Sequence, residues 1–160
     1  MINFLKKNKI YKVHTPISGN SINIEKVNDS MFSGKLMGDG IAIIPNSNVV
    51  VAPCDGKITV LPESKHAFGI ISNDGIEILV HIGIDTVNLH GDGFKSEVSQ
   101  GNVVKKGDPI IRFDREKLTS LGIDCTTMIV VLNHTEFPNI NCIFDYDVVA
   151  GQDTVIEIMK

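Results

Sequence analysis

Two histidines, His66 and His81, are the side chains in this sequence best suited to chemistry. His81 lies in a stretch whose even positions are all apolar: Ile76, Ile78, Val80, Ile82 and Ile84. Because side chains along a strand alternate between its two faces, we expect this stripe to face the core. The odd positions then face the other way, and they are Glu77, Leu79, His81, Gly83, Asp85 and Val87.

A hairpin would bring His66 to the same face as His81. Residues 73–74 (Asn-Asp) or 74–75 (Asp-Gly) can form a two-residue turn. The first turn places His66 directly across from His81, and the second makes the two histidines diagonal neighbours. Both loops have an even length, so both put the two imidazoles on one face, whereas a three-residue loop would break this pairing. The other side chains expected on that face include Ser64, Phe68 and Ile70.

Two neighbouring imidazoles and a hydroxyl suit phosphoryl transfer. A neutral imidazole nitrogen is a good nucleophile near neutral pH, and partial burial keeps it neutral. A second imidazole can donate a hydrogen bond to the phosphoryl oxygens, over which the transition state spreads its charge. We expect Ser64 to fix the other nitrogen of His66, and a backbone carbonyl near Gly83 to fix that of His81. The alternative is two unrelated histidines on a solvated face.

Short β-branched runs between frequent turn signals predict an all-β fold, an antiparallel sandwich or barrel. One short helix is expected over residues 115–121, with Asp114 as its N-cap and Gly122 in the left-handed position beyond its end. The predicted strands are residues 41–44, 49–52, 57–60, 76–84, 109–113, 128–132 and 154–159.

Composition limits the class of protein. The 160 residues suit one domain, which we assign to residues 13–160, with residues 1–12 as a flexible N-terminal arm. A weak basic amphipathic anchor over the first ten residues is the alternative. The net charge of -4 argues against a nucleic-acid partner. Three widely spaced cysteines without a C-x-x-C pair favour a reducing cytoplasm. The longest later apolar run, residues 128–132, is far too short to span a membrane.

Several segments, in order along the chain, resemble the glucose-type enzyme IIA proteins of the bacterial phosphoenolpyruvate-dependent sugar phosphotransferase system. The resemblance has its core at about residues 29–135 and implies a cytoplasmic phosphocarrier with an antiparallel β-sandwich, of a duplicated hybrid-motif type, and one or two short helices. The matching segments are residues 32–43 (FSGKLMGDGIAI), 51–56 (VAPCDG), 65–68 (KHAF), 75–94 (GIEILVHIGIDTVNLHGDGF) and 107–108 (GD).

The resemblance also implies roles for individual residues. His81 corresponds to the phosphorylated histidine and His66 to the supporting one, while Asp29 and Asp85 match two carboxylates near the site. The implied donor is the histidine phosphocarrier protein, and the implied acceptor is the IIB domain of a membrane sugar permease. The implied apolar rim for these partners consists of Phe32, Leu36, Met37, Leu79 and Val87.

Other readings are weaker. A zinc peptidase with a related sandwich would need an H-x-H pair, and His81-Ile82-Gly83 stands there instead. A biotinyl or lipoyl carrier domain, whose strands residues 51–58 weakly echo, needs a lysine motif that this chain lacks. A regulatory role remains an alternative, in which partners bind according to the phosphorylation state. No intrinsic metal or cofactor is expected, although a partner could complete a zinc site at His66 and His81.

Overall fold

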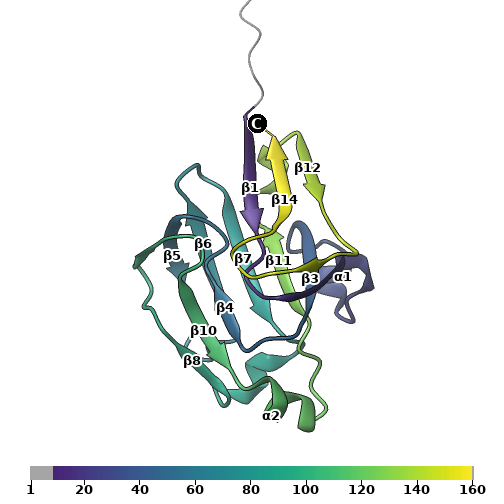
Figure 1. The fold of residues 1–160 in the computed structure, drawn as a ribbon, viewed down its shortest axis with the longest axis vertical. Coiled ribbons are helices and arrows are strands. Elements are labelled where there is room, and N and C mark those ends of the chain that lie inside the picture. The colour runs from purple at the N-terminus through teal and green to yellow at the C-terminus, as the bar shows by residue number, and fades with distance from the viewer. Residues whose placement is uncertain (1–8, 160) are drawn as a thin grey trace, which may run out of the picture.

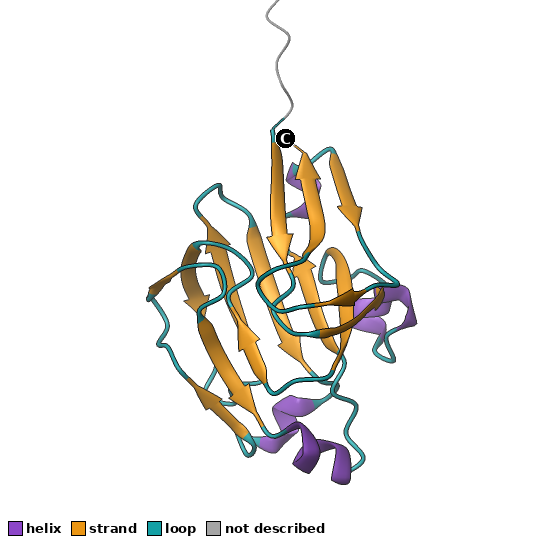
Figure 2. Cartoon of the chain, in the orientation of Figure 1, coloured by secondary structure: helices purple, strands orange, loops and turns teal. Residues whose placement is uncertain are grey.

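The alternation of apolar and polar residues builds a protein whose regular secondary structure consists mainly of antiparallel strands. The structure, a computed structural model, describes residues 9–159 (Figure 1). Each of the seven predicted strand segments overlaps a strand of the structure, and the helices are few and short (Figure 2). The strands are β1 (Ile10–His14), β2 (Gly19–Asn23), β3 (Asp39–Pro45), β4 (Val49–Val51), β5 (Gly56–Val60), β6 (Ala67–Ser72), β7 (Glu77–Ile82), β8 (Phe94–Ser96), β9 (Val103–Val104), β10 (Pro109–Phe113), β11 (Thr127–Val131), β12 (Asn139–Cys142), β13 (Asp147–Val148) and β14 (Thr154–Met159).

The strands form one large sheet and two small ones. The large sheet has eight strands in the order β13-β2-β3-β11-β7-β6-β5-β9, and the small sheets have the orders β1-β14-β12 and β4-β10-β8. In Figure 1 both small sheets lie in front of the large one. All the strand pairs in the described part of the chain are antiparallel. The predicted antiparallel β-sandwich is therefore confirmed.

The main hydrophobic core fills the space between the large sheet and the small ones. Strand β7 contributes the side chains of Ile78, Val80 and Ile82, which lie at its even-numbered positions and face the core as expected. The small sheets contribute Ile111 from β10 and Ile156 from β14, both fully buried. A second, smaller cluster is built around Phe32, Met128 and Val130. Because Met128 and Val130 alternate along β11 with core residues, this second cluster lies on the outer face of the large sheet.

Within residues 9–159, two short helices and three 3-10 turns join the strands. The helix predicted over residues 115–121 is present as α2 (Arg115–Ser120). Asp114 Oδ1 accepts a hydrogen bond from the Lys117 N–H at 3.0 Å and caps this helix. Gly122 beyond its end has φ 76°, as predicted. The second helix, α1 (Ser30–Ser33), falls within the one or two short helices that the resemblance implies, but its position was not predicted. The 3-10 turns are η1 (Ile24–Lys26), η2 (Thr86–Leu89) and η3 (His134–Glu136).

The predicted N-terminal arm requires a correction. Its first eight residues lie outside the described part of the chain, but residues 10–12 are not an arm, because they begin strand β1. Tyr11 pairs with Ile158 and Val13 with Ile156 of β14. Strand β1 is stabilised because Val13 and the β14 residues Ile156 and Ile158 are buried.

The described residues give two further findings on composition. Cys54, Cys125 and Cys142 are all free thiols, and burial raises the pKa of each. Between residues 9 and 159 no helix has the length and apolar character needed to cross a membrane.

Candidate functional site

His81 lies on the outer face of the large sheet, near the end of β7. Its direct neighbours across the sheet are Ala67 on β6 and Met128 on β11. The His81 ring is partly buried, and its Nδ1 lies 2.9 Å from the carbonyl oxygen of Gly83. A carbonyl oxygen can only accept a hydrogen bond, so Nδ1 must carry the proton. The neutral ring therefore keeps its free lone pair on Nε2.

A tight turn follows His81 and aims the Gly83 carbonyl at it. Gly83 has φ 76°, and Asp85 two residues later has φ 56°. A Cβ atom at Gly83 would lie 2.5 Å from Thr86 Cγ2. The backbone conformation and the close approach of Thr86 both require glycine at this position. The turn also ends the alternation of β7, so that Ile84 joins the second cluster instead of the main core.

The β6–β7 hairpin differs from the predicted one, and His66 lies in the turn before β6 instead of opposite His81. Ile71 pairs with Glu77, and Ser72 N–H donates to the carbonyl of Ile76, so the loop consists of the three residues 73–75. This odd length places Ala67, not His66, opposite His81. The prediction of an even loop is therefore wrong.

The same register corrects the predicted positions of Phe68 and Ile70. Both were expected on the histidine face, but they are buried in the main core, where they pair with Val80 and Ile78. A three-residue loop shifts every β6 side chain to the other face relative to β7.

The turn before β6 nevertheless brings His66 to His81. Lys65 has φ 52°, a left-handed conformation that changes the direction of the chain just before the strand. The Ile82 N–H donates to the carbonyl of His66 at 2.7 Å and ties this turn to the end of β7. The His66 and His81 ring centroids lie 4.9 Å apart, and the ring planes meet at 81°.

Ser64 holds the second histidine. Its Oγ lies 2.6 Å from His66 Nδ1. When the hydroxyl donates to this nitrogen, the neutral ring carries its proton on Nε2 and becomes a donor there. The pair then presents one Nε2 with a lone pair, on His81, and one Nε2–H, on His66.

Burial keeps both imidazoles neutral near pH 7. Burial lowers the pKa of His66. Burial, followed by repulsion from His66, lowers the pKa of His81 to about 4. The Gly83 hydrogen bond and the negative charges of Asp29 and Asp85 oppose this fall without cancelling it. A nucleophilic nitrogen is thus available over the whole physiological pH range.

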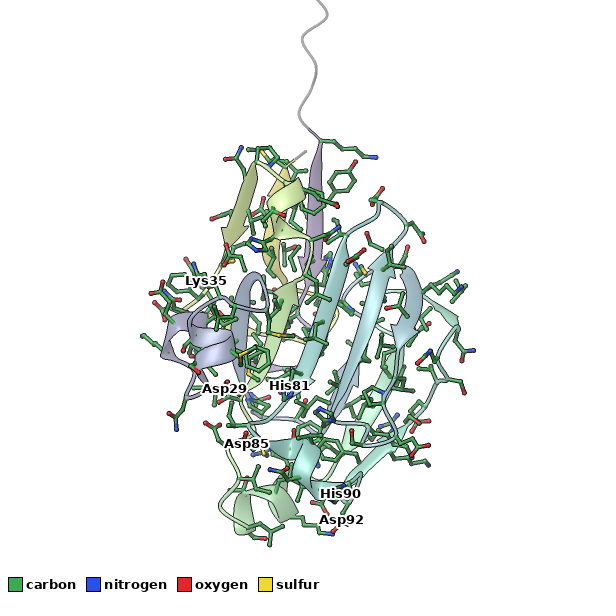
Figure 3. All side chains as sticks on the ribbon, turned by 180° about the vertical axis from the view of Figure 1, so that it is seen from behind. Asp29, Lys35, His81, Asp85, His90 and Asp92 are labelled. Carbon is green, nitrogen blue, oxygen red and sulfur yellow. The ribbon has the colours of Figure 1, made fainter. Side chains whose placement is uncertain are left out.

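Helix α1 brings a carboxylate and an aromatic ring to the site. Asp29 is its N-cap, and its Oδ1 accepts a hydrogen bond from the Met31 N–H at 3.0 Å. The Phe32 ring centroid lies 5.0 Å from that of His81. Figure 3 shows Asp29, His81 and Asp85 gathered on this face of the sheet, with His90 and Asp92 farther away.

The five residues expected to form the apolar rim differ in exposure. Phe32 is buried, and Leu79 and Met37 are partly buried in the second cluster. Leu36 and Val87 are 69% and 48% exposed, which leaves them free to contact another molecule. The immediate neighbours Ala67 and Met128 were missed as parts of the site. Met128 could have been found only from its register against β7, which no local signal in the sequence specifies.

The described residues contain no group of three or more His, Cys, Asp or Glu side chains placed to hold a metal ion. His66 and His81 could supply two nitrogen ligands. A zinc site has at least three protein ligands, so these two nitrogens alone do not make one.

The fold and sequence match known proteins over most of the chain. The solved structure of glucose permease IIA from Mycoplasma capricolum superposes with a TM-score of 0.86, at 35% identity, over 96% of this chain and 99% of that one. The sequence model of the phosphoenolpyruvate-dependent sugar phosphotransferase system EIIA 1 family matches residues 11–137. This chain therefore belongs to that family, whose members are phosphotransferase components, and the resemblance found in the sequence is confirmed.

Individual relatives agree with this assignment. The glucose-specific EIIA component of Haemophilus influenzae is 43% identical over 97% of this chain and 94% of its own length. The glucose-specific EIIA component of Borreliella burgdorferi is 40% identical over 97% of this chain and 85% of its own length.

Proposed function

We propose that the protein is a cytoplasmic phosphocarrier that holds a phosphoryl group on Nε2 of His81. The observation that carries this proposal is the arrangement of the two rings. Each Nδ1 is engaged, by the Gly83 carbonyl and by Ser64 Oγ, and the ring centroids lie 4.9 Å apart. This leaves one nucleophilic Nε2 beside one Nε2–H donor.

The chemistry of the transfer follows from these atoms. The lone pair of His81 Nε2 attacks the phosphorus of a phosphohistidine donor, an N–P bond forms, and the N–P bond of the donor breaks. The donor nitrogen leaves with the electron pair of that bond. The Nε2–H of His66 donates to a phosphoryl oxygen and stabilises the charge that passes through the transition state. The reverse sequence of events at the downstream acceptor regenerates neutral His81.

The proposed donor is the histidine phosphocarrier protein, and the proposed acceptor is the IIB domain of a membrane sugar permease. The relatives are glucose-specific EIIA components, so glucose is the first sugar to test. Docking is assigned to the apolar rim, with Leu36 and Val87 as its exposed members. Asp29 and Asp85, whose charges act on His81, would attract a basic partner surface.

The test is to mix the protein with phosphoenolpyruvate, enzyme I and the histidine phosphocarrier protein, and to locate the phosphate. We expect an adduct on His81 that is labile in acid and stable in alkali, as an imidazole N–P bond is. Nitrogen-15 and phosphorus-31 NMR should place it on Nε2. An acid-stable adduct would mean a hydroxyl acceptor and would contradict the proposal.

A further inference from the structure

The peptide group that accepts the hydrogen bond from His81 is itself hydrogen-bonded on its opposite side. The Gly83 carbonyl accepts from His81 Nδ1 at 2.9 Å. The N–H of the same peptide group belongs to Ile84, and it donates to the carbonyl of Asp124 at 2.9 Å. In a planar trans peptide the C=O and N–H point in opposite directions. The carbonyl of Asp124 therefore fixes the orientation of the Gly83–Ile84 peptide group, whose C=O points toward His81.

A second bond from the same loop completes this clamp. The Gly83 N–H donates to the carbonyl of Thr126 at 3.0 Å, so the peptide groups before and after Gly83 are both anchored to residues 124–126. Gly83 needs this anchoring more than most residues, because glycine has the widest freedom of backbone rotation.

The Asp124 carboxylate sets the shape of the anchoring loop. Its Oδ1 accepts from the Thr126 N–H at 2.9 Å and from Thr126 Oγ1 at 2.7 Å. These two bonds fold residues 124–126 so that both carbonyls point toward the Gly83 turn. Asp124 itself is exposed, while Thr126 is buried. The charged groups that act on the pKa of His81 are His66, Asp29 and Asp85, so Asp124 is not placed to act on the ring by its charge.

We propose that Asp124, acting through Thr126 and the Gly83–Ile84 peptide, is a positioning residue that holds His81 in the Nδ1–H tautomer. This inference rests on the proposed function for its effect on phosphorylation. Its effect on the tautomer can be measured without any phosphoryl donor. Asp124 acts by geometry: when the loop relaxes, the Gly83 carbonyl turns away and Nε2 becomes free to take the proton. A protonated Nε2 cannot attack phosphorus.

The test compares four variants in the full-length chain. Asp124→Ala removes both bonds to Thr126, and Thr126→Val removes one of them. Asp124→Asn keeps an Oδ1 that can accept both. Asp108→Ala is the matched control, because Asp108 Oδ2 also accepts from a backbone N–H, that of Lys105 at 2.9 Å. The backbone hydrogen bonds of this turn go to Ala52 and within the turn itself, and not to Gly83.

Two readouts are taken on each variant. Imidazole nitrogen-15 NMR gives the tautomer of His81, with His66 as the internal reference. The rate of phosphoryl uptake from the histidine phosphocarrier protein gives the consequence. For Asp124→Ala we expect a mixed His81 tautomer and an uptake rate lowered about tenfold, equivalent to about 1.4 kcal/mol. Thr126→Val should show a smaller change of the same kind, and Asp124→Asn and Asp108→Ala should behave like the parent protein.

The outcomes separate this inference from the proposed function. If the His81 tautomer is unchanged in Asp124→Ala, the positioning role is wrong, whether or not the rate falls. If the parent protein takes up no phosphate on His81, the proposed function fails, and the tautomer measurement still decides the role of Asp124.

Discussion

The rings of His66 and His81 meet edge to face at 81°, with centroids 4.9 Å apart, although the two residues come from different kinds of structure. His81 is on a regular strand, and His66 is in the turn before the neighbouring strand. Two protonated rings could not share this space without strong repulsion. The pair is therefore built to work in its neutral form, and the first prediction follows from this property.

The stability of the protein should fall as the pH is lowered from about 6.5 to about 4. Burial lowers the pKa of folded His81 to about 4, whereas the unfolded chain takes up its proton near 6.5. Within this window the unfolded state binds more protons, so acid favours unfolding, and the lowered pKa of His66 acts in the same direction. Urea unfolding across the window measures this loss. His81→Gln, which has no such proton to bind, should lose less stability, and an equal loss would show that the His81 pKa is not depressed.

Gly83→Ala should destabilise the fold strongly. Gly83 has φ 76°, and an added Cβ would lie 2.5 Å from Thr86 Cγ2 and 3.1 Å from the Asp124 carbonyl oxygen. We expect a loss of at least about 3 kcal/mol in the free energy of unfolding, from backbone strain and steric overlap together. Gly101→Ala is the matched control, because Gly101 has φ 94° with open space around it. That variant should lose only about 1 to 2 kcal/mol. Similar losses from the two variants would mean that contacts at Gly83 are unimportant.

Ser64 should matter through its hydroxyl and not through its size. Ser64→Ala removes the partner of His66 Nδ1, which lies 2.6 Å away. A net hydrogen bond contributes about 1 kcal/mol, so transfer from the phosphorylated protein to the downstream acceptor should slow roughly fivefold. Ser64→Thr retains the hydroxyl and should restore most of the rate. The assigned role fails if the threonine variant is as slow as the alanine variant, or if the alanine variant keeps the full rate.

Asp85 should accelerate docking of the upstream partner. Asp85→Asn removes the charge but keeps the shape, and asparagine tolerates the left-handed backbone found there at φ 56°. We expect association with the histidine phosphocarrier protein to slow several-fold at low ionic strength and to depend less on salt. Asp29 would be a poorer test, because its carboxylate also caps α1.

The matched control for Asp85 is Asp145→Asn. Asp145 is exposed and has φ 68°, but its charge does not act on His81. Stopped-flow association rates at several salt concentrations give the comparison. An electrostatic role for Asp85 is wrong if the two variants associate at the same rate at low salt.

Local patterns in the sequence predicted the strands and the outer-face position of His81. The stripe from Ile76 to Ile82 faces the main core, because a two-residue period in apolar side chains leaves few other solutions. The cap of α2 was equally readable, since Asp114 and Gly122 each have a local physical role.

The pairing of β6 with β7 could not be predicted in the same way. Residues 73–75 (Asn-Asp-Gly) allow both two-residue and three-residue loops, and tertiary packing decides between them. The three-residue loop places Phe68 and Ile70 in the core, and the burial of these two apolar side chains stabilises this pairing. His66 and His81 therefore do not meet through the strand pairing that was predicted. The two rings meet because of the turn at Lys65, a left-handed residue with no local signal for that conformation.

Contacts between segments that are distant along the chain could not be predicted from the sequence either. Asp124 follows Gly83 by some forty positions, and only the pairing of β11 with β7 brings their backbones together. The same holds for α1, which covers the outer face of the sheet and places Phe32 against His81. The resemblance to the enzyme IIA family named Phe32, but the residues alone did not locate it.

The most direct test of the account compares phosphoryl uptake by His81→Gln and His66→Gln. An amide cannot hold the phosphoryl group, so His81→Gln should take up none from the histidine phosphocarrier protein. His66→Gln keeps a hydrogen-bond donor and should still be phosphorylated on His81, while its transfer onward to sugar in the presence of permease membranes falls roughly 100-fold. Phosphate uptake by the His81 variant, together with none by the His66 variant, would contradict the central claim and reverse the two roles.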